Sequence, residues 1–313
     1  MRPLADPQKL FIMAGMPRAG TTYMYDVLCA HPGVFLPFRK ELSFFSAKFE
    51  KGEVWYRSFF SEATDSQICG DFSPDYFLHP AAIGRIQALA PDARIILAVR
   101  EPASWAVSFH RHIATFELRV PRFAEFLERH PVPDMRIFRG ASSQQTFSIR
   151  DSLVQRTLEE YRRAFGARLL VYSFDYFKAR PLAVVQSIER FLGLPPKLNQ
   201  SALPDGVINS NQRTNIRFLS YLLSRDIVAA VTGRIFPRRF IQGLRKTFDR
   251  VSSRPARRAT DPSHDIDFKT AQSILAADRD YVASLFAQYP IQLGTGEAFL
   301  WDDPHTEKGR CSS

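Results

Sequence analysis

Short apolar runs that lead into helical patterns recur along the first two hundred residues, and they limit the fold more than any other feature. Each run is bounded by Gly, Pro or charged residues and is too short for a helix, which favours a buried strand. The alternation predicts an α/β fold with a P-loop-like central parallel sheet flanked by helices. The expected strands are Lys9–Gly15, Ala93–Val99 and Arg168–Tyr172, and the helices that follow them cover about Gly20–Ala30, Ala103–Phe116 and Pro181–Leu192.

The rest of the chain indicates one domain over residues 1–313, with a core at about 9–195 and a helical and basic region at about 196–313. With 45% hydrophobic residues, the chain can bury the core that such a domain needs. Proline-rich or polar stretches at 121–145 and 196–212 predict loops, and the patterns at Ile216–Val231 and Phe268–Gln288 predict C-terminal helices. Loops outside the carboxyl ends of strands shape binding sites in such sheets, so we expect both loops to border an acceptor pocket.

The turn Gly15–Thr22 lies between the first expected strand and its helix, where backbone N–H groups and the helix dipole converge on an anion. Arg18 adds a positive charge, and two threonines add hydroxyl donors. The glycine spacing matches the nucleotide-binding pattern GxxxxGKS/T, but Thr21 replaces its lysine. This replacement disfavours a triphosphate site, so a nucleotide kinase is kept as an alternative only. The competing interpretation is an ordinary strand-to-helix turn without a ligand, but even taken alone the turn favours a phosphate site.

A second cation follows the second expected strand. Arg100 stands where a triphosphate-using enzyme would place a magnesium-binding carboxylate, and an arginine there favours another phosphate. Ser108, eight residues further on, would lie in the second turn of the next helix and face the same phosphate. The competing interpretations are a surface ion pair between Arg100 and Glu101 and a solvated serine. The two elements together favour a ligand with two separate phosphates over a triphosphate.

Four stretches complete a larger pattern: Gly15–Thr22 (GMPRAGTT), Lys40–Phe45 (KELSFF), Asp71–Phe77 (DFSPDYF) and Val99–Ser108 (VREPASWAVS). In order and approximate spacing they resemble the sulfotransferases that use 3′-phosphoadenosine-5′-phosphosulfate, above all the glycan-type (heparan sulfate sulfotransferase-like) enzymes and their bacterial relatives. The resemblance implies that this compound is the donor, that 3′-phosphoadenosine-5′-phosphate is the product, and that no metal is required. It implies transfer to a hydroxyl, less readily to an amine, of a carbohydrate, lipid-linked or small-molecule acceptor.

The same resemblance assigns roles to single residues. Glu41 is the expected general base, and Arg18 and Lys40 are expected to stabilise charge as the sulfuryl group is transferred. From the residues alone, Glu41 would be an exposed glutamate paired with Lys40. The expected donor-binding residues are Arg18, Ala19, Gly20, Thr21 and Thr22 at the 5′ end, and Arg100 and Ser108 at the 3′-phosphate.

The chain departs from the family pattern at two positions. Phe72 stands in place of a lysine that in the family reaches the transferring group, and Trp105 stands in place of an inner arginine. Lys40 or Arg18 would have to supply the missing charge. The other candidate bases are His110, His112 and Asp71.

The net charge of +10 is concentrated in the segment Arg234–Arg258, where nine basic residues oppose Asp249 alone. Apolar residues interleave with the cations at near-helical spacing, which fits contact with an anionic membrane surface or a polyanion. No nucleic acid partner is expected. Three widely spaced cysteines indicate neither a disulfide framework nor a zinc site, so we expect a cytoplasmic protein, with peripheral membrane contact as an option. A non-catalytic membrane- or polyanion-binding protein on a degenerate sulfotransferase fold is the third hypothesis.

Overall fold

The computed structural model of the chain describes residues 9–116, 122–128, 152–204, 213–214, 253–254 and 262–299. Three sequence predictions fall mostly outside these residues: the loop 121–145, the helix Ile216–Val231 and the basic segment Arg234–Arg258. Of the last, the structure describes only β7 (Ser253–Arg254), which pairs with β6 (Arg213–Thr214) in a small antiparallel ribbon. None of the described helices is long and apolar enough to cross a membrane.

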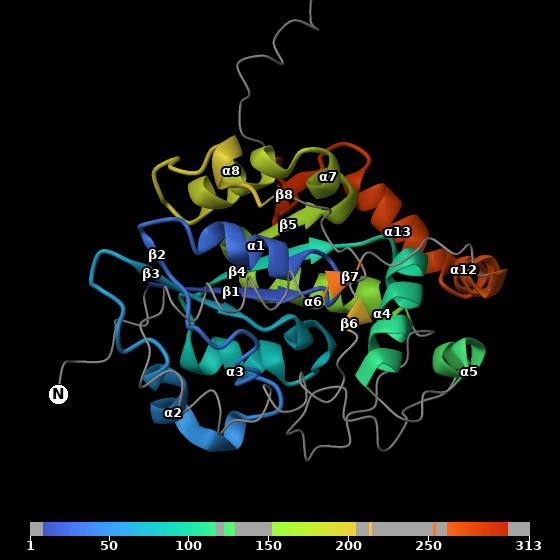
Figure 1. Ribbon diagram of the computed structural model, residues 1–313, viewed down its shortest axis with the longest axis horizontal. Helices are drawn as coiled ribbons and strands as arrows, with labels where there is room; N and C mark the ends of the chain where they lie inside the picture. The colour runs from blue at the N-terminus through green and yellow to red at the C-terminus, as the bar shows by residue number, and fades with distance from the viewer. Residues whose placement is uncertain are drawn as a thin grey trace, which may run out of the picture.

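A six-stranded sheet forms the centre of the molecule, in the order β2-β3-β1-β4-β5-β8 (Figure 1). The first five strands in this order run parallel, and β8 at the edge runs antiparallel to β5. The prediction of an α/β fold with a mostly parallel sheet is therefore confirmed, and the sheet is mixed rather than wholly parallel. The strands are β1 (Leu10–Gly15), β2 (Val34–Phe35), β3 (Ile68–Phe72), β4 (Arg94–Val99), β5 (Leu169–Ser173) and β8 (Ile291–Leu293).

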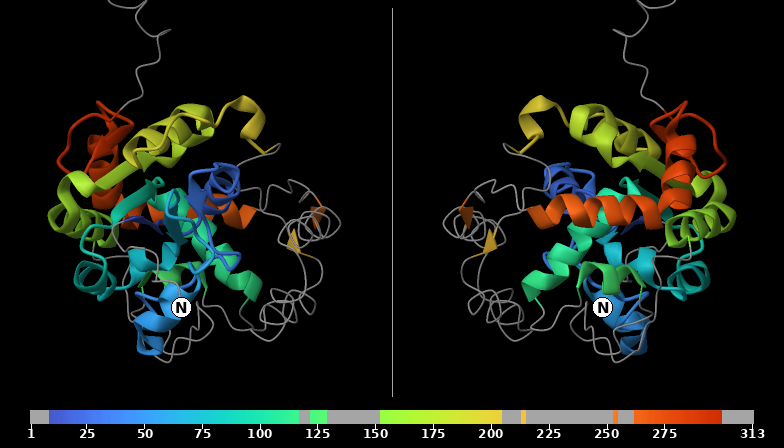
Figure 2. Two further views of the ribbon diagram at one scale, coloured as in Figure 1. Left: turned by 90° about the vertical axis from the view of Figure 1, so that its left-hand side faces the viewer. Right: turned by 90° about the vertical axis from the view of Figure 1, so that its right-hand side faces the viewer.

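Helices cover both faces of this sheet. In Figure 1, α8 lies above the sheet, α1 overlaps its middle strands in the view, and α2 and α3 lie below it. The helices α4 and α12 pack together beyond the end of the sheet where α4 begins. Figure 2 shows α12 crossing the molecule beside α4. The described α-helices are α1 (Thr21–Leu28), α2 (Gly52–Ser58), α3 (Ala82–Leu89), α4 (Pro102–Phe116), α5 (Phe123–Glu128), α6 (Leu153–Phe165), α7 (Phe174–Ala179), α8 (Pro181–Phe191), α12 (Pro262–Ile274) and α13 (Ala276–Phe286).

Two helical predictions need correction. The pattern Phe268–Gln288 is divided between α12 and α13, with a break at Leu275, whose side chain is buried. The expected loop from residue 121 begins with the helix α5, because Phe123, Phe126 and Leu127 recur at helical spacing and bury their side chains. The helices expected after the three apolar runs match α1, α4 and α8 to within two residues at each end.

The parallel register brings the carboxyl ends of the central strands to one edge of the sheet. Met13 of β1 lies opposite Phe72 of β3, and Gly15 lies opposite Leu97 of β4. The turn after β1, the segment after β3 and the residue after β4 therefore meet at this edge. In open α/β sheets this is the edge at which ligands bind.

Candidate functional site

The turn between β1 and α1 requires both of its glycines. Gly20 has a φ of 78° directly before α1, a left-handed conformation that glycine adopts without a steric penalty. A Cβ atom on Gly15 would lie 2.5 Å from the Cβ of Phe77, so no side chain fits there. The N–H groups in the first turn of α1 have no partner within the helix, so at Thr21 and Thr22 they are available to an anion.

Side chains from the β4–α4 connection hold the carbonyl groups of this turn. Trp105 Nε1 donates a hydrogen bond to the Pro17 oxygen at 3.1 Å, and Arg100 Nη1 donates one to the Arg18 oxygen at 3.0 Å. With its carbonyl oxygens engaged by protein donors, the turn can present N–H groups to a ligand. The two predicted anion-binding elements are thus joined directly.

Two arginines give this part of the site its positive charge. Burial lowers the pKa of Arg18, and the nearby Glu41 acts in the opposite direction. Burial also lowers the pKa of Arg100, and the charge of Arg18 lowers it further. Partly buried like charges repel each other, which raises the free energy of the ligand-free site. A bound anion between the two arginines would offset this repulsion. Ser108 is buried in the second turn of α4, as the sequence predicts.

The Lys40-Glu41 pair reaches the same turn from the loop before α2. Lys40 Nζ donates a hydrogen bond to Thr22 Oγ1 at 2.7 Å and lies 3.4 Å from Glu41 Oε1. The side chain of Lys40 is 9% exposed and that of Glu41 is 51% exposed, so the carboxylate is open to an incoming molecule. The structure therefore brings the candidate base to the edge of the candidate donor site.

Positive φ angles mark three non-glycine residues of this site. Arg18 has a φ of 64°, Glu41 of 62° and Ser43 of 52°. Each left-handed residue costs about 1 kcal/mol and persists only where its surroundings hold it. The backbone of the turn and of the Glu41 loop is therefore fixed by contacts rather than by local preference.

The other three candidate bases occupy different environments. His112 lies near Arg18, Glu41 and Lys40, and its pKa is lowered to about 4, by burial first and then by Arg18. It is therefore a neutral imidazole near pH 7, and the lowered pKa makes it a weak proton acceptor. His110 packs instead against the rings of α5, with Phe123 at 5.3 Å.

Asp71 is not placed to act as a base. Its side chain is fully buried and accepts hydrogen bonds from Ser73 at 2.6 Å, Tyr76 at 2.7 Å and Tyr56 at 3.1 Å. Burial raises the pKa of Asp71, and these hydroxyl groups act in the opposite direction. No acceptor molecule can reach a carboxylate enclosed in this way, so its role is internal.

Phe72 lies in the core. Its ring is 2% exposed and packs edge-on against Phe11 at 5.9 Å and Tyr25 at 5.4 Å. The position where the family pattern has a lysine thus contributes apolar packing here. Among the described residues, Lys40 is the lysine that touches the turn.

Sequence reasoning missed two contributors to the site, Trp105 and Tyr76. The family pattern presents Trp105 only as the replacement of an arginine, although Trp105 lies three residues before Ser108 and so on the same face of α4. This spacing is a signal that would have placed its indole toward the turn. The role of Tyr76, whose hydroxyl meets the backbone of the Glu41 loop, depends on tertiary contacts and has no sequence signal.

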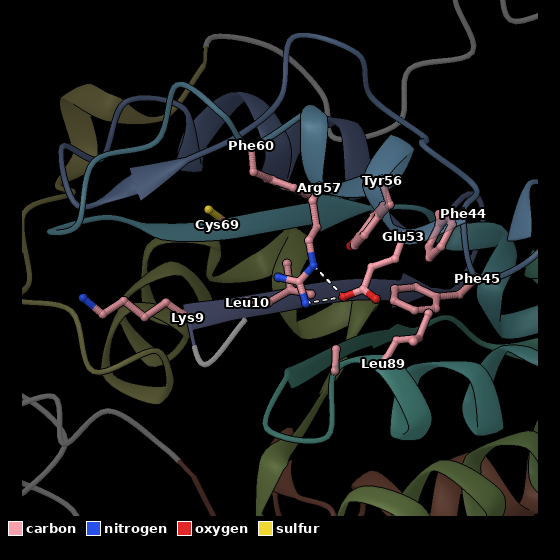
Figure 3. Close-up of a pocket in the computed structure, with 11 residues that line it drawn as sticks. Lys9, Leu10, Phe44, Phe45, Glu53, Tyr56, Arg57, Phe60, Cys69 and Leu89 are labelled. Carbon is pink, nitrogen blue, oxygen red and sulfur yellow. Dashed lines mark hydrogen bonds and ion pairs between the residues drawn. The ribbon is translucent and has the colours of Figure 1, made fainter. Parts of the chain in front are cut away.

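An apolar cavity of about 40 Å³ lies at the opposite end of β1 from the turn, bordered by α2 (Figure 3). Glu53 and Arg57 form an ion pair at one side of it. Small-molecule sites have volumes of roughly 300 Å³ or more, so this cavity is too small for a nucleotide. Its other lining residues include Leu10, Phe44, Phe45, Tyr56, Phe60 and Cys69. No group of residues able to hold a metal ion occurs in the described parts of the chain.

A glycine-bounded turn after the first strand of a mostly parallel sheet, joined by a hydrogen bond to an arginine after the neighbouring strand, defines an α/β protein with a P-loop-like fold. The sulfotransferase domain family matches residues 8–215. This is more than half of the chain, and the chain belongs to that family. The resemblance carried by the four sequence stretches is therefore confirmed.

Related proteins fit this assignment. Human heparan sulfate glucosamine 3-O-sulfotransferase 6 is 29% identical over 189 residues, which is 60% of this chain and 52% of that protein. The mouse bifunctional heparan sulfate N-deacetylase/N-sulfotransferase 4 is 28% identical over 207 residues, 61% of this chain and 23% of that protein. The chain spans about half the length of the first of these curated relatives.

A solved structure supports the fold. The sulfotransferase from Alicyclobacillus acidocaldarius has a TM-score of 0.50 and 22% identity, over 72% of this chain and 93% of that one. At this identity the similarity concerns the fold alone.

Proposed function

We propose that this protein transfers a sulfuryl group from 3′-phosphoadenosine-5′-phosphosulfate to a hydroxyl group of a carbohydrate acceptor. The observation that carries the proposal is the contact of Lys40 with both Thr22 and Glu41, because it supports a general base next to the turn that we propose to bind the 5′-phosphosulfate. The relatives named as heparan sulfate sulfotransferases favour a carbohydrate over a lipid-linked or other small-molecule acceptor. A hydroxyl is favoured over an amine by the 3-O-sulfotransferase relatives.

In this proposal the chain binds the donor at two places. Arg18 and the N–H groups and hydroxyls of the turn hold the 5′-phosphosulfate, and Arg100 with Ser108 holds the 3′-phosphate. The direct hydrogen bond from Arg100 to the Arg18 carbonyl supports a single ligand that touches both elements. The remaining turn residues in contact would be Ala19, Gly20, Thr21 and Thr22.

The residues of the site suffice for an in-line displacement. Glu41 accepts the proton of the acceptor hydroxyl while that oxygen forms a bond to sulfur. The bond between sulfur and the bridging phosphate oxygen breaks, and its electron pair stays on the phosphate. Arg18 and Lys40 stabilise the charge that develops on this oxygen. The sulfuryl group carries less negative charge than a phosphoryl group, so the proposal includes no metal ion.

A transfer assay with labelled donor tests the proposal. We expect label to move to a glycan in a pool of glycans, lipids and phenols with a chelator present, and we expect heat stabilisation by 3′-phosphoadenosine-5′-phosphate but not by ATP. Metal-dependent phosphoryl transfer from ATP, or stabilisation by ATP alone, would support the nucleotide kinase instead. Donor-product binding without transfer to any acceptor would support the non-catalytic alternative.

The variant Glu41→Gln tests the base. It removes the proton acceptor but keeps the size of the side chain, so we expect turnover to fall by a factor of at least about 100 with unchanged affinity for the product nucleotide. Glu50→Gln, which changes an exposed glutamate outside the site, serves as the matched control. Turnover of Glu41→Gln equal to that of the control removes Glu41 from the mechanism.

The basic segment Arg234–Arg258 lies outside the described residues apart from β7, and its contact with an anionic membrane or polyanion stays a prediction. So does the cytoplasmic location. Flotation with phosphatidylserine vesicles, compared with neutral vesicles, tests the membrane contact, which should weaken as salt is raised.

A further inference from the structure

The loop that carries Glu41 is held from inside by two hydroxyl groups. Ser43 donates its backbone N–H to Ser73 Oγ at 3.0 Å. Phe44 and Phe45 donate their N–H groups to Tyr76 Oη, at 2.9 and 3.3 Å. Three consecutive amides of the loop therefore donate hydrogen bonds to side chains of the segment that follows β3.

A single buried carboxylate orients both hydroxyls. Ser73 Oγ donates to Asp71 Oδ1 at 2.6 Å, and Tyr76 Oη donates to Asp71 Oδ2 at 2.7 Å. A hydroxyl has one proton, so a hydroxyl that donates to Asp71 turns its lone pairs toward the loop amides. The same relay, from carboxylate to hydroxyl to backbone amide, thus occurs twice around Asp71.

The loop depends on such support. Glu41 and Ser43 both have positive φ angles, a conformation that side chains of L residues disfavour. The Glu41 N–H donates a hydrogen bond to the Phe72 carbonyl at 3.0 Å, so the backbone of Glu41 is also bound to the residue that follows Asp71. Without the two hydroxyls as acceptors, three buried amides would lose their hydrogen-bond partners. This loss costs free energy and would favour another conformation of the loop.

We propose that Asp71, acting through Tyr76 and Ser73, is a positioning residue that fixes the loop from which Glu41 reaches the acceptor. This inference rests on the proposed function, in which Glu41 is the base. Asp71 itself touches neither substrate, because its side chain is enclosed.

Two tyrosines allow a matched test. Tyr56 and Tyr76 both donate their hydroxyls to Asp71 Oδ2, at 3.1 and 2.7 Å, but only Tyr76 accepts from the amides of Phe44 and Phe45. Tyr76→Phe and Tyr56→Phe each remove one buried hydroxyl and keep the ring. The pair therefore separates the support of the loop from a general loss of stability.

We expect Tyr76→Phe to reduce kcat by about tenfold or more, because small displacements of a catalytic group are costly. Its KM for the donor and its affinity for 3′-phosphoadenosine-5′-phosphate should stay within about twofold. Hydrogen exchange should show amides 44 and 45 exchanging at least about tenfold faster. Tyr56→Phe should change none of these values by more than about twofold.

The outcomes separate the inference from the proposed function. If Tyr76→Phe and Tyr56→Phe have the same kcat and the same exchange rates in the loop, the inference is wrong, even where Glu41→Gln abolishes transfer. If loop exchange is faster in Tyr76→Phe but Glu41→Gln keeps full turnover, the loop is positioned as inferred and the assignment of the base fails. Should Tyr76→Phe not fold, Ser73→Ala removes the acceptor of the Ser43 amide, with faster exchange at amide 43 as the expected result.

Discussion

At the scale of single residues, the site depends on side chains that hold its backbone. Trp105 replaces an arginine of the family pattern, yet its indole is fully buried and binds the carbonyl group of Pro17. It also stacks on Phe109, with ring centroids 5.5 Å apart and an angle of 11° between the rings. The replacement therefore exchanges a charge for a hydrogen bond that supports the turn Gly15–Thr22.

Trp105→Phe tests this support. It keeps an aromatic ring against Phe109 but removes the donor to Pro17, so we expect a loss of about 1 kcal/mol in the free energy of unfolding. Affinity for 3′-phosphoadenosine-5′-phosphate should fall by about threefold to tenfold, as measured by calorimetry. Trp55→Phe, on α2 away from the turn, is the control. Equal affinities in the two variants would show that the indole does not support the turn.

Asp75 gives a second prediction at this scale. Its buried side chain contacts Ser46, and its Oδ1 has no hydrogen-bond partner among the described residues. Its pKa is raised to about 7, mainly by burial. The folded state thus keeps a proton that the unfolded chain releases near pH 4, so the stabilisation is complete below that pH and is lost as the pH rises through about 7.

Between pH 5 and pH 8, this group should therefore remove about 3 kcal/mol from the free energy of unfolding. Asp75→Asn cannot ionise and should lack this part of the pH dependence. Urea unfolding of both proteins at the two pH values measures the difference. Parallel pH profiles would contradict the assignment of this titration to Asp75.

At the scale of elements, α13 joins the C-terminal helices to the core. Asp278 of α13 accepts hydrogen bonds from the N–H groups of Val154 at 3.4 Å and Gln155 at 2.9 Å, at the start of α6. The next residue, Arg279, binds Glu101, which in turn accepts from two amides at the start of α4. One turn of α13 thus fixes the N-termini of two helices.

The cap on α6 can be tested by substitution. Ser152 precedes this helix in a left-handed conformation and gives no side-chain cap, so Asp278 is the group that satisfies the two amides. Asp278→Ala should lower the free energy of unfolding by about 1–2 kcal/mol, and Asp278→Asn, which keeps one acceptor oxygen, by less. Asp280→Ala, at an exposed position of the same helix, should have little effect. Chemical denaturation provides the measurement.

At the scale of the molecule, the sequence could predict what its local patterns encode. The apolar runs of β1, β4 and β5 and the order of the four family stretches were sufficient for the fold and for the grouping of Arg18, Lys40 and Glu41. The sequence does not predict the strand β3, because Gly70 and Asp71 interrupt its apolar run, although both residues are buried. The burial of Asp71 depends on hydroxyl groups from other parts of the chain, which the sequence does not reveal. Asp71 is a candidate base in the sequence, but in the structure it binds buried hydroxyl groups.

The whole molecule should also respond to the two anion-binding elements as one site. 3′-Phosphoadenosine-5′-phosphate can occupy both elements, whereas 5′-AMP lacks the 3′-phosphate. A ligand that binds only the folded state stabilises it by about 2.7 kcal/mol at a concentration of a hundred times its Kd. At equal concentrations, the bisphosphate should therefore raise the Tm more than 5′-AMP does.

Arg100→Ala should remove most of this difference, because the lost guanidinium faces the 3′-phosphate in the proposed complex. Arg94→Ala provides the control: Arg94 begins the same strand and binds the Leu192 carbonyl at 2.7 Å, at the end of β4 away from the turn. Each variant is compared with its own ligand-free Tm, so any loss of intrinsic stability cancels. If the bisphosphate still raises the Tm of Arg100→Ala more than 5′-AMP does, the 3′-phosphate binds elsewhere. The turn Gly15–Thr22 would then be the one anion site left in the proposal.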